Sequence, residues 1–190
     1  MRPESFVAAL ADAQFGEACN FYRDGEGAEL RRQRLQSYLG RQEAAWLLIV
    51  GEAPGYRGAR VSGIPFTSER QLSGTGPAEA TATVVQRTLG ELGIVGETLL
   101  WNVLPAHPYL PGQPDTNRRP SRIEIEAGLP FVDMLASGRR VVPVGRVAGE
   151  ALGMPWIRHP SHGGAKAFRE GLASAWGCQS GRMRSGPYKV

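Results

Sequence analysis

An uninterrupted apolar run, Trp46 to Val50, is followed at once by a turn-forming segment, Gly51-Glu52-Ala53-Pro54-Gly55. A short, fully apolar run that stops at glycine and proline is typical of a strand buried in a parallel sheet. Ligands of open α/β sheets bind just beyond the carboxyl ends of such strands. The run therefore places Glu52 at the edge of the sheet where chemistry is expected. Taken alone, the same turn is equally typical of an exposed loop with an incidental carboxylate.

The length of the chain, 190 residues, is enough for one domain with a sizeable core. We expect a single domain over residues 1–190, with N-terminal helices over 1–45 and a mobile tail over 178–190. No apolar stretch is long enough to cross a membrane. The acidic residues Glu4 and Asp12 near the start argue against a signal peptide, so we expect a cytoplasmic protein.

The number of cysteines and the net charge limit the cofactors and partners that the protein can bind. Cys19 and Cys178 are the only cysteines, too few for a four-thiolate metal or iron–sulfur site, so we expect no metal and no cofactor. A net charge of +4 permits a polyanionic partner without requiring one. Arginines cluster at 118–122, at 139–140 and in the tail. Each cluster alone is more typical of solvated surface, whereas together they are compatible with a phosphate-binding face.

Apolar periodicity and turn residues predict alternating helices and strands. Helices are expected over 5–18, 29–39, 77–92, from 121 onward, 146–152 and 165–176, and strands over 46–50, 98–103, 140–144 and, weakly, 155–158. Pro130 is expected to kink or interrupt its helix. The long loop 51–76 is expected to be ordered, because it contains apolar residues. The alternation predicts an α/β fold, a three-layer α/β/α sandwich with a central four-stranded parallel sheet.

Four side chains follow or adjoin the predicted strand ends: Glu52, Phe66, Asn102 and His159. A glutamate can orient or deprotonate a water, and an aromatic ring can stack on a nucleobase. An amide matches the Watson–Crick edge of a base, and an imidazole can stabilise a developing oxyanion. Each also has a structural alternative: a core anchor for Phe66, a strand-end cap for Asn102, and a satisfied structural histidine for His159. Their convergence at one sheet edge favours a site.

The ordered motifs Gly51-Glu-Ala-Pro-Gly55, Gly63-Ile-Pro-Phe66, Trp101-Asn102 and His159-Pro-Ser161 resemble those of the uracil-DNA glycosylase superfamily. The nearest pattern is the branch with a Gly-Glu-Ala-Pro-Gly motif, and the resemblance covers about residues 46–164. It implies a DNA glycosylase that flips a damaged or modified base, uracil by default, out of DNA. Hydrolysis of the N-glycosidic bond would leave an abasic site in base excision repair.

The resemblance also implies roles for individual residues. Glu52, Asn102 and His159 would be catalytic: Glu52 would hold the attacking water, Asn102 would read the base and His159 would stabilise the departing base. The base would be bound by Gly51, Ala53, Phe66 and Asn102. Ser161, His162, Gly163 and Gly164 would contact DNA, and the basic cluster adds Arg118 and Arg119 as expected DNA-binding residues. The partner would be single- or double-stranded DNA with a lesion, bound by a monomer that associates with the nucleoid.

The sequence departs from that branch in ways that leave the substrate open. The four cysteines of its iron–sulfur cluster are missing, and the loop 56–60 is basic or neutral rather than acidic. Hypoxanthine or a modified pyrimidine therefore remains an alternative to uracil. His162 is assigned equally to a substrate contact or a phosphate contact, and His107 and Tyr109 are expected near the pocket rim.

Two other functions remain as alternatives. A non-catalytic protein that binds damaged or modified DNA on the same fold would fit the missing cluster and the altered loops. A nucleotide-binding protein unrelated to DNA is less favoured, because no phosphate-binding glycine motif or acidic metal cluster is present. Within the glycosylase hypothesis, the candidate motifs contain no lysine, which favours hydrolysis by water over a lysine-dependent lyase.

Overall fold

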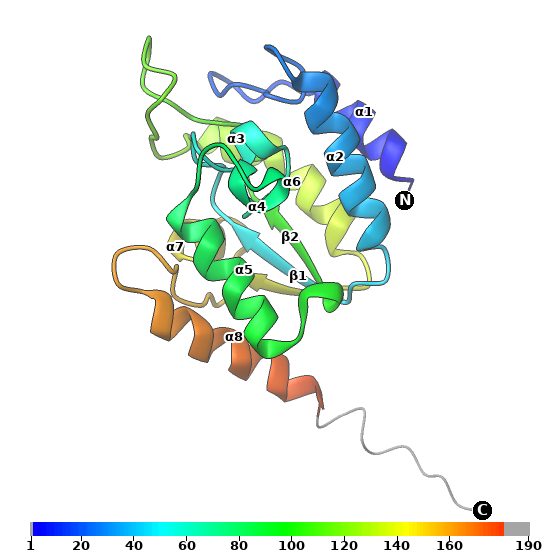
Figure 1. Cartoon of the computed structure of the whole chain (residues 1–190), viewed down its shortest axis with the longest axis vertical. Coiled ribbons are helices and arrows are strands. Elements are labelled where there is room, and N and C mark those ends of the chain that lie inside the picture. The colour runs from blue at the N-terminus through cyan, green and yellow to red at the C-terminus, as the bar shows by residue number, and fades with distance from the viewer. Residues whose placement is uncertain (1, 181–190) are drawn as a thin grey trace, which may run out of the picture.

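The computed structural model describes residues 2–180 and has an α/β architecture built on a parallel sheet. The strands are β1 (Leu47–Gly51), β2 (Thr98–Asn102) and β3 (Arg140–Pro143). The α-helices are α1 (Pro3–Asp12), α2 (Ala28–Arg41), α3 (Ala59–Ser62), α4 (Glu69–Ser73), α5 (Ala80–Leu92), α6 (Arg122–Ala136), α7 (Arg146–Leu152) and α8 (Ala165–Ser180), and a 3₁₀ turn, η1 (Val95–Glu97), precedes β2. Figure 1 shows α1, α2 and α6 on one side of the sheet and α5 and α8 on the other.

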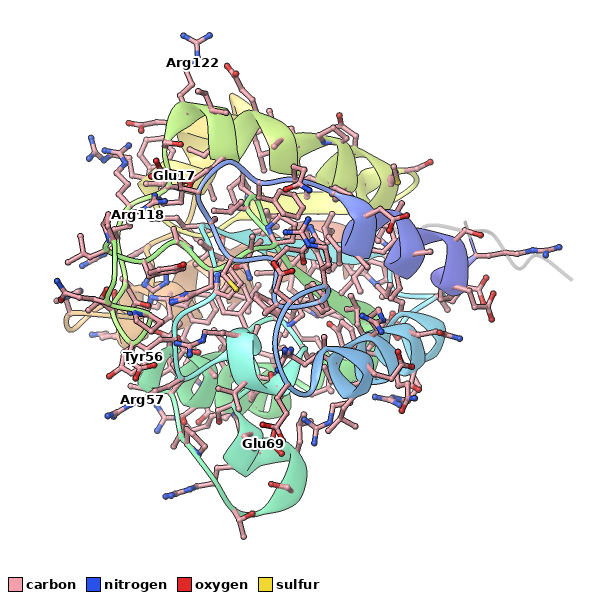
Figure 2. The ribbon with its side chains drawn as sticks, turned by 90° about the horizontal axis from the view of Figure 1, so that it is seen from above. Glu17, Tyr56, Arg57, Glu69, Arg118 and Arg122 are labelled. Carbon is pink, nitrogen blue, oxygen red and sulfur yellow. The ribbon has the colours of Figure 1, made fainter. Side chains whose placement is uncertain are left out.

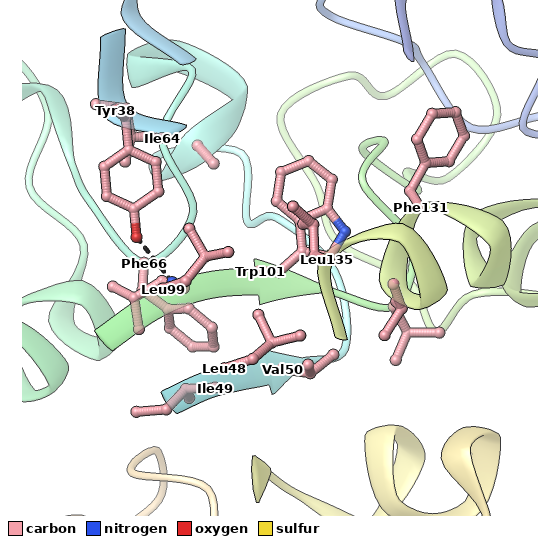
Figure 3. Close-up of a cluster of buried hydrophobic side chains, with 14 of the residues drawn as sticks. Tyr38, Leu48, Ile49, Val50, Ile64, Phe66, Leu99, Trp101, Phe131 and Leu135 are labelled. Carbon is pink, nitrogen blue, oxygen red and sulfur yellow. Dashed lines mark hydrogen bonds between the residues drawn. The ribbon is translucent and has the colours of Figure 1, made fainter. Parts of the chain in front are cut away.

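The strand order is β2-β1-β3, so the apolar run identified in the sequence forms the central strand. All five residues of β1 are buried, because the strand has a neighbour on each edge and helices over each face. Leu48 and Val50 pair with Leu99 and Trp101, and these side chains face the aromatic cluster around α6 in Figure 3. In that cluster the ring of Phe6 lies 5.3 Å from that of Trp101 in an edge-to-face arrangement.

The expected fourth strand over 155–158 does not form. The structure has three strands, and this segment contributes one isolated parallel bridge between Val144 and Ile157. Ile157 donates its N–H to Pro143 O at 3.0 Å and accepts from Gly145 N at 2.9 Å. Pairing ends there because Trp156 packs onto Gly149 of α7, where any Cβ would overlap its ring, and because Pro160 soon follows without an N–H to donate.

Several predicted boundaries also shift. The first helix ends at Asp12 rather than at residue 18, because the amide of Asn20 donates to the carbonyls of Leu10, at 2.8 Å, and Ala13, at 3.1 Å. Helix α5 begins at Ala80 instead of Pro77. Helix α6 continues through Pro130 to Ala136, so the proline does not interrupt it.

The two long loops are ordered, as expected for the first. The segment 51–76 contains α3 and α4, and the proline-rich segment after β2 forms an isolated bridge with the N-terminal region between His107 and Cys19. Residues 181–190, most of the predicted mobile tail, lie outside the described residues. Among residues 2–180, no helix is both long and apolar enough to span a lipid bilayer.

Candidate functional site

A cavity of about 340 Å³ opens at the carboxyl ends of β1 and β2. Glu52, Phe66, Asn102 and His159 all line it, although they come from four separate segments of the chain. Ala53, Arg118 and His162 line it as well. The structure thus brings the four predicted side chains together in one hollow, at the sheet edge where parallel strands of open α/β folds place their ligands.

The floor of the cavity depends on Gly51. Gly51 pairs with Asn102 in the parallel register, so both residues face the same side of the sheet. A Cβ on Gly51 would overlap the ring of Phe66 and would lie 2.9 Å from Oδ1 of Asn102. A glycine at this position therefore lets an aromatic ring and an amide approach the same stretch of backbone.

Asn102 is only 4% exposed, and no other group within residues 2–180 hydrogen-bonds to its side-chain amide. Buried amides are nearly always paired, so an open donor and acceptor aimed into a cavity are a sign of ligand binding. Its neighbour in sequence, Val103, continues the pairing beyond the strands by donating its N–H to Gly51 O at 2.8 Å. The backbone that carries the amide is therefore fixed.

Phe66 has a backbone φ of 51°, in the left-handed region that side chains other than glycine rarely adopt. Two contacts hold it there: Gln86 Nε2 donates to Phe66 O at 3.1 Å, and the buried Ser62 hydroxyl donates to Thr67 O at 2.5 Å. Such backbone strain costs about 1–3 kcal/mol and is concentrated at functional sites. His162 has the same φ, and it also lines the cavity.

Glu52 is partly buried, and its carboxylate has no hydrogen-bond donor among the described residues. Burial raises its pKa, and the nearby positive charge of Arg119 only partly opposes this. The backbone is held by Leu104, which donates its N–H to Glu52 O at 3.0 Å. A fixed but unpaired carboxylate of raised pKa has the properties of a general base.

The orientation of the His159 ring is set by Ser161. The Ser161 backbone N–H donates to Nδ1 of His159 at 3.2 Å, so Nδ1 carries the lone pair and Nε2 carries the proton of the neutral ring. Burial lowers the pKa of His159, and the charges of Arg158 and His162 lower it further. The ring is therefore a neutral N–H donor at pH 7.

Residues 39–179 match the sequence profile of the Uracil DNA glycosylase superfamily. The chain belongs to this superfamily. The crystal structure of wild-type SMUG2 from Pedobacter heparinus is similar in fold, with a TM-score of 0.69 and 14% sequence identity over 95% of this chain and 99% of that chain. No protein with a curated description matches the chain in sequence.

This superfamily member has only two cysteines, so its residues do not fit the four-thiolate iron–sulfur cluster of the branch whose first motif it shares. Within residues 2–180, no three histidine, cysteine, aspartate or glutamate side chains are grouped so that they could hold a metal ion.

The arginines of the superfamily member differ in their environment. Arg118 lines the cavity, but its guanidinium is bound to the carboxylate of Glu124 at 2.5 and 2.7 Å and donates to Tyr109 O at 2.9 Å. Glu124 is 1% exposed, so the pair is largely withdrawn from solvent. Figure 2 shows Arg118 on the loop before α6 and Arg122 projecting outward from the helix. Arg119 is exposed and lies 3.4 Å from Glu150.

Three further residues of the site were missed by sequence reasoning: Glu79, Thr81 and Asn117 line the same cavity. Nothing in the pattern around them signals a site, because they lie at a helix start and in a proline-rich loop. His107, expected near the rim, is 1% exposed and does not line the cavity. Its ring lies between Pro54 O, at 3.0 Å, and Pro114 O, at 3.3 Å, and so connects the first motif to the proline-rich loop.

Proposed function

We propose that this protein is a monofunctional DNA glycosylase that extrudes a damaged or modified base, uracil by default, and hydrolyses its N-glycosidic bond. The observation that carries the proposal is the single cavity lined by Glu52, Phe66, Asn102 and His159. Membership of the superfamily supports the reaction class, since its members are typically glycosylases.

In the proposed reaction, the extruded base stacks on Phe66, and the open amide of Asn102 pairs with its Watson–Crick edge. The Nε2–H of neutral His159 donates to a carbonyl oxygen of the base, which gains negative charge as the glycosidic bond breaks. Glu52 accepts a proton from the water that attacks C1′ of the sugar. The base leaves as an anion and takes up a proton from solvent, and Glu52 returns its proton to solvent, so the products are the free base and an abasic deoxyribose.

The loop around His159 supports a role in holding the DNA strand. Ser161 Oγ lies 2.7 Å from Nδ1 of His159 and 3.0 Å from Nδ1 of His162, so one hydroxyl links the His159 imidazole to the exposed His162. Arg119, beside Glu52, is exposed to an approaching phosphate. DNA contact through these groups is part of the proposal.

The decisive experiment uses single- and double-stranded oligonucleotides, each with one uracil, hypoxanthine or oxidised pyrimidine and a labelled end. We expect strand cleavage only after alkali, because a water-dependent glycosylase leaves an intact abasic strand. Cleavage without alkali would contradict the water mechanism. Tight binding of lesion DNA with no release of any base would instead establish the alternative function, a binding protein on this fold.

A further inference from the structure

The cavity has a second carboxylate that the proposed reaction does not use. Glu79 immediately precedes α5, and its side chain lines the same cavity as Glu52. Its backbone carbonyl accepts from the N–H and the hydroxyl of Thr83, each at 3.0 Å, which anchors the residue at the start of the helix. The side chain is therefore directed from a rigid element into the pocket.

The carboxyl group of Glu79 occupies a niche made by two glycines. A Cβ on Gly55 would lie 2.7 Å from Oε1 of Glu79, and a Cβ on Gly58 would lie 2.8 Å from its Cδ and would overlap Oε2. Both glycines belong to the loop that follows Glu52. The loop thus has no side chain at the two positions where the second carboxylate needs room.

Within the described residues, no hydrogen bond or ion pair satisfies this carboxylate. Burial raises the pKa of Glu79, with no opposing positive charge. Glu79 is partly buried, and a partly buried carboxyl group without a partner is unfavourable in the free protein. Such groups are concentrated where a ligand supplies the partner. Thr81, the second residue of α5, also lines the cavity.

Glu52 and Glu79 serve different parts of the pocket. Arg119 influences the charge of Glu52, whereas Glu79 lies beyond Gly55 and Gly58 on the side of α5. In the proposed pose, Glu52 is near the sugar, His159 is at the carbonyl oxygen of the leaving base and Asn102 is at the Watson–Crick edge. These three groups leave one edge of the base without a partner, and Glu79 is the carboxylate of the cavity that the proposed reaction does not use.

We propose that Glu79 is a specificity-determining residue, whose carboxyl group accepts a hydrogen bond from a donor on the base edge that Asn102 leaves free. The inference rests on the proposed function and deepens it. A base with a hydroxyl or amino substituent at that edge is favoured, and a base with a methyl group of similar size is disfavoured. A hydrogen bond to a charged acceptor changes such a preference by roughly 10- to 100-fold.

The test compares base release from DNA with uracil, 5-hydroxyuracil or thymine in one sequence context. The last two bases differ by an O–H donor in place of a methyl group. For the parent protein we expect faster release of 5-hydroxyuracil than of thymine, and Glu79→Gln should reduce this ratio about tenfold or more. Glu97→Gln, at an exposed glutamate outside the cavity, is the matched control and should keep the parental ratio.

A second variant displaces the same carboxylate by a change in the neighbouring loop. Gly58→Ala places a methyl group where Oε2 of Glu79 lies, so it should lower the same ratio without altering Glu79 itself. In the Glu79→Ala background the added methyl group meets no carboxylate, so Gly58→Ala should have little further effect on the ratio. Circular dichroism and thermal unfolding identify a variant that has lost its fold.

The possible outcomes distinguish failure of the proposed role of Glu79 from failure of the glycosylase assignment. If the parent releases bases and Glu79→Gln keeps the parental ratio, the inference is wrong and the glycosylase assignment stands. If the parent releases no base, the assignment fails, and binding of the same three oligonucleotides decides the inference. A preference for 5-hydroxyuracil that Glu79→Gln removes would then support it, and equal affinities in both proteins would overturn it.

Discussion

The ring of Phe66 lies so close to the α-carbon of Gly51 that no side chain could be accommodated at position 51. Phe66 reaches this place through a left-handed backbone, held by Gln86 and Ser62. Gly51 is also the strand partner of Asn102. Because Gly51 has no side chain, the Phe66 ring can pack directly on its backbone. This contact forms the floor of the pocket next to Asn102, which we propose binds the edge of the base.

Gly51→Ala tests this relationship. The added methyl group overlaps the Phe66 ring, and overpacking of this kind costs about 1–3 kcal/mol of unfolding free energy. We expect a lower urea midpoint together with loss of base release. Phe66→Ala should remove the overlap, so the double variant should be less destabilised than the sum of the two single variants. If the changes in unfolding free energy of the two single variants simply add in the double variant, the two residues are not in steric contact in solution.

Glu52→Gln tests the proposed general base. We expect the single-turnover rate of base release to fall about 10²- to 10⁴-fold, while lesion-DNA affinity is retained. Burial raises the pKa of Glu52, so its ionised form destabilises the native state at neutral pH, and the variant should also melt at a higher temperature. A variant that is both slow and less stable would argue that Glu52 is a structural residue.

The pH dependence of base release follows from the same carboxylate. Catalysis requires ionised Glu52, and its raised pKa means that activity is lost on acidification at a higher pH than for an ordinary glutamate. The rate of base release, measured with saturating enzyme from pH 4 to 9, should show this acid limb. Retention of the full rate down to the range of an exposed glutamate would rule out the role.

His159→Ala should lower base release strongly, since it removes the Nε2–H donor, and one such donor is typically worth roughly 3–4 kcal/mol of barrier. Ser161→Ala retains the backbone N–H that fixes the tautomer, so it should have a smaller effect. His162→Ala removes the second ring on the same hydroxyl, which also lines the cavity, and should lower base release less than His159→Ala. Equal effects of all three substitutions would indicate damage to the loop rather than loss of a catalytic donor.

Substitution of Arg118 should lower stability, whereas substitution of the adjacent Arg119 should weaken DNA binding. Arg118→Ala leaves Glu124 buried without its partner and should cost about 3–5 kcal/mol of unfolding free energy. Arg119→Ala should leave stability unchanged and reduce the slope of log affinity against log salt by about 1. Denaturant unfolding and salt-dependent DNA binding measure the two effects separately.

The same ion pair gives a stability prediction with acid. Burial raises the pKa of Glu124, but hydrogen bonds from Arg118 and the Ser121 backbone outweigh this and lower it overall. A carboxylate with a lowered pKa in the folded state stabilises the protein above its unfolded pKa, and this contribution is lost as pH falls through the folded pKa. Glu124→Gln should therefore weaken the dependence of the unfolding free energy on pH in that acidic range.

The sequence by itself determined the central strand, the order of the motifs and the edge of the sheet at which Glu52, Asn102 and His159 lie. These features depend on apolar runs and on turn residues, which act over a few neighbours along the chain. Strand and helix ends depend on distant partners and were predicted less well. The Asn20 amide shortens the first helix, and the packing of Trp156 on Gly149 reduces the fourth strand to a single bridge.

Only the tertiary structure decided which polar groups have a partner and which remain open to the pocket. Arg118 and Arg119 are indistinguishable in the sequence, yet one is bound to a buried glutamate and the other is exposed. Glu79 enters the pocket because two glycines of another loop leave room for its carboxyl group. The energy of a charged group is set by burial and by neighbours in space, and the fold alone creates both.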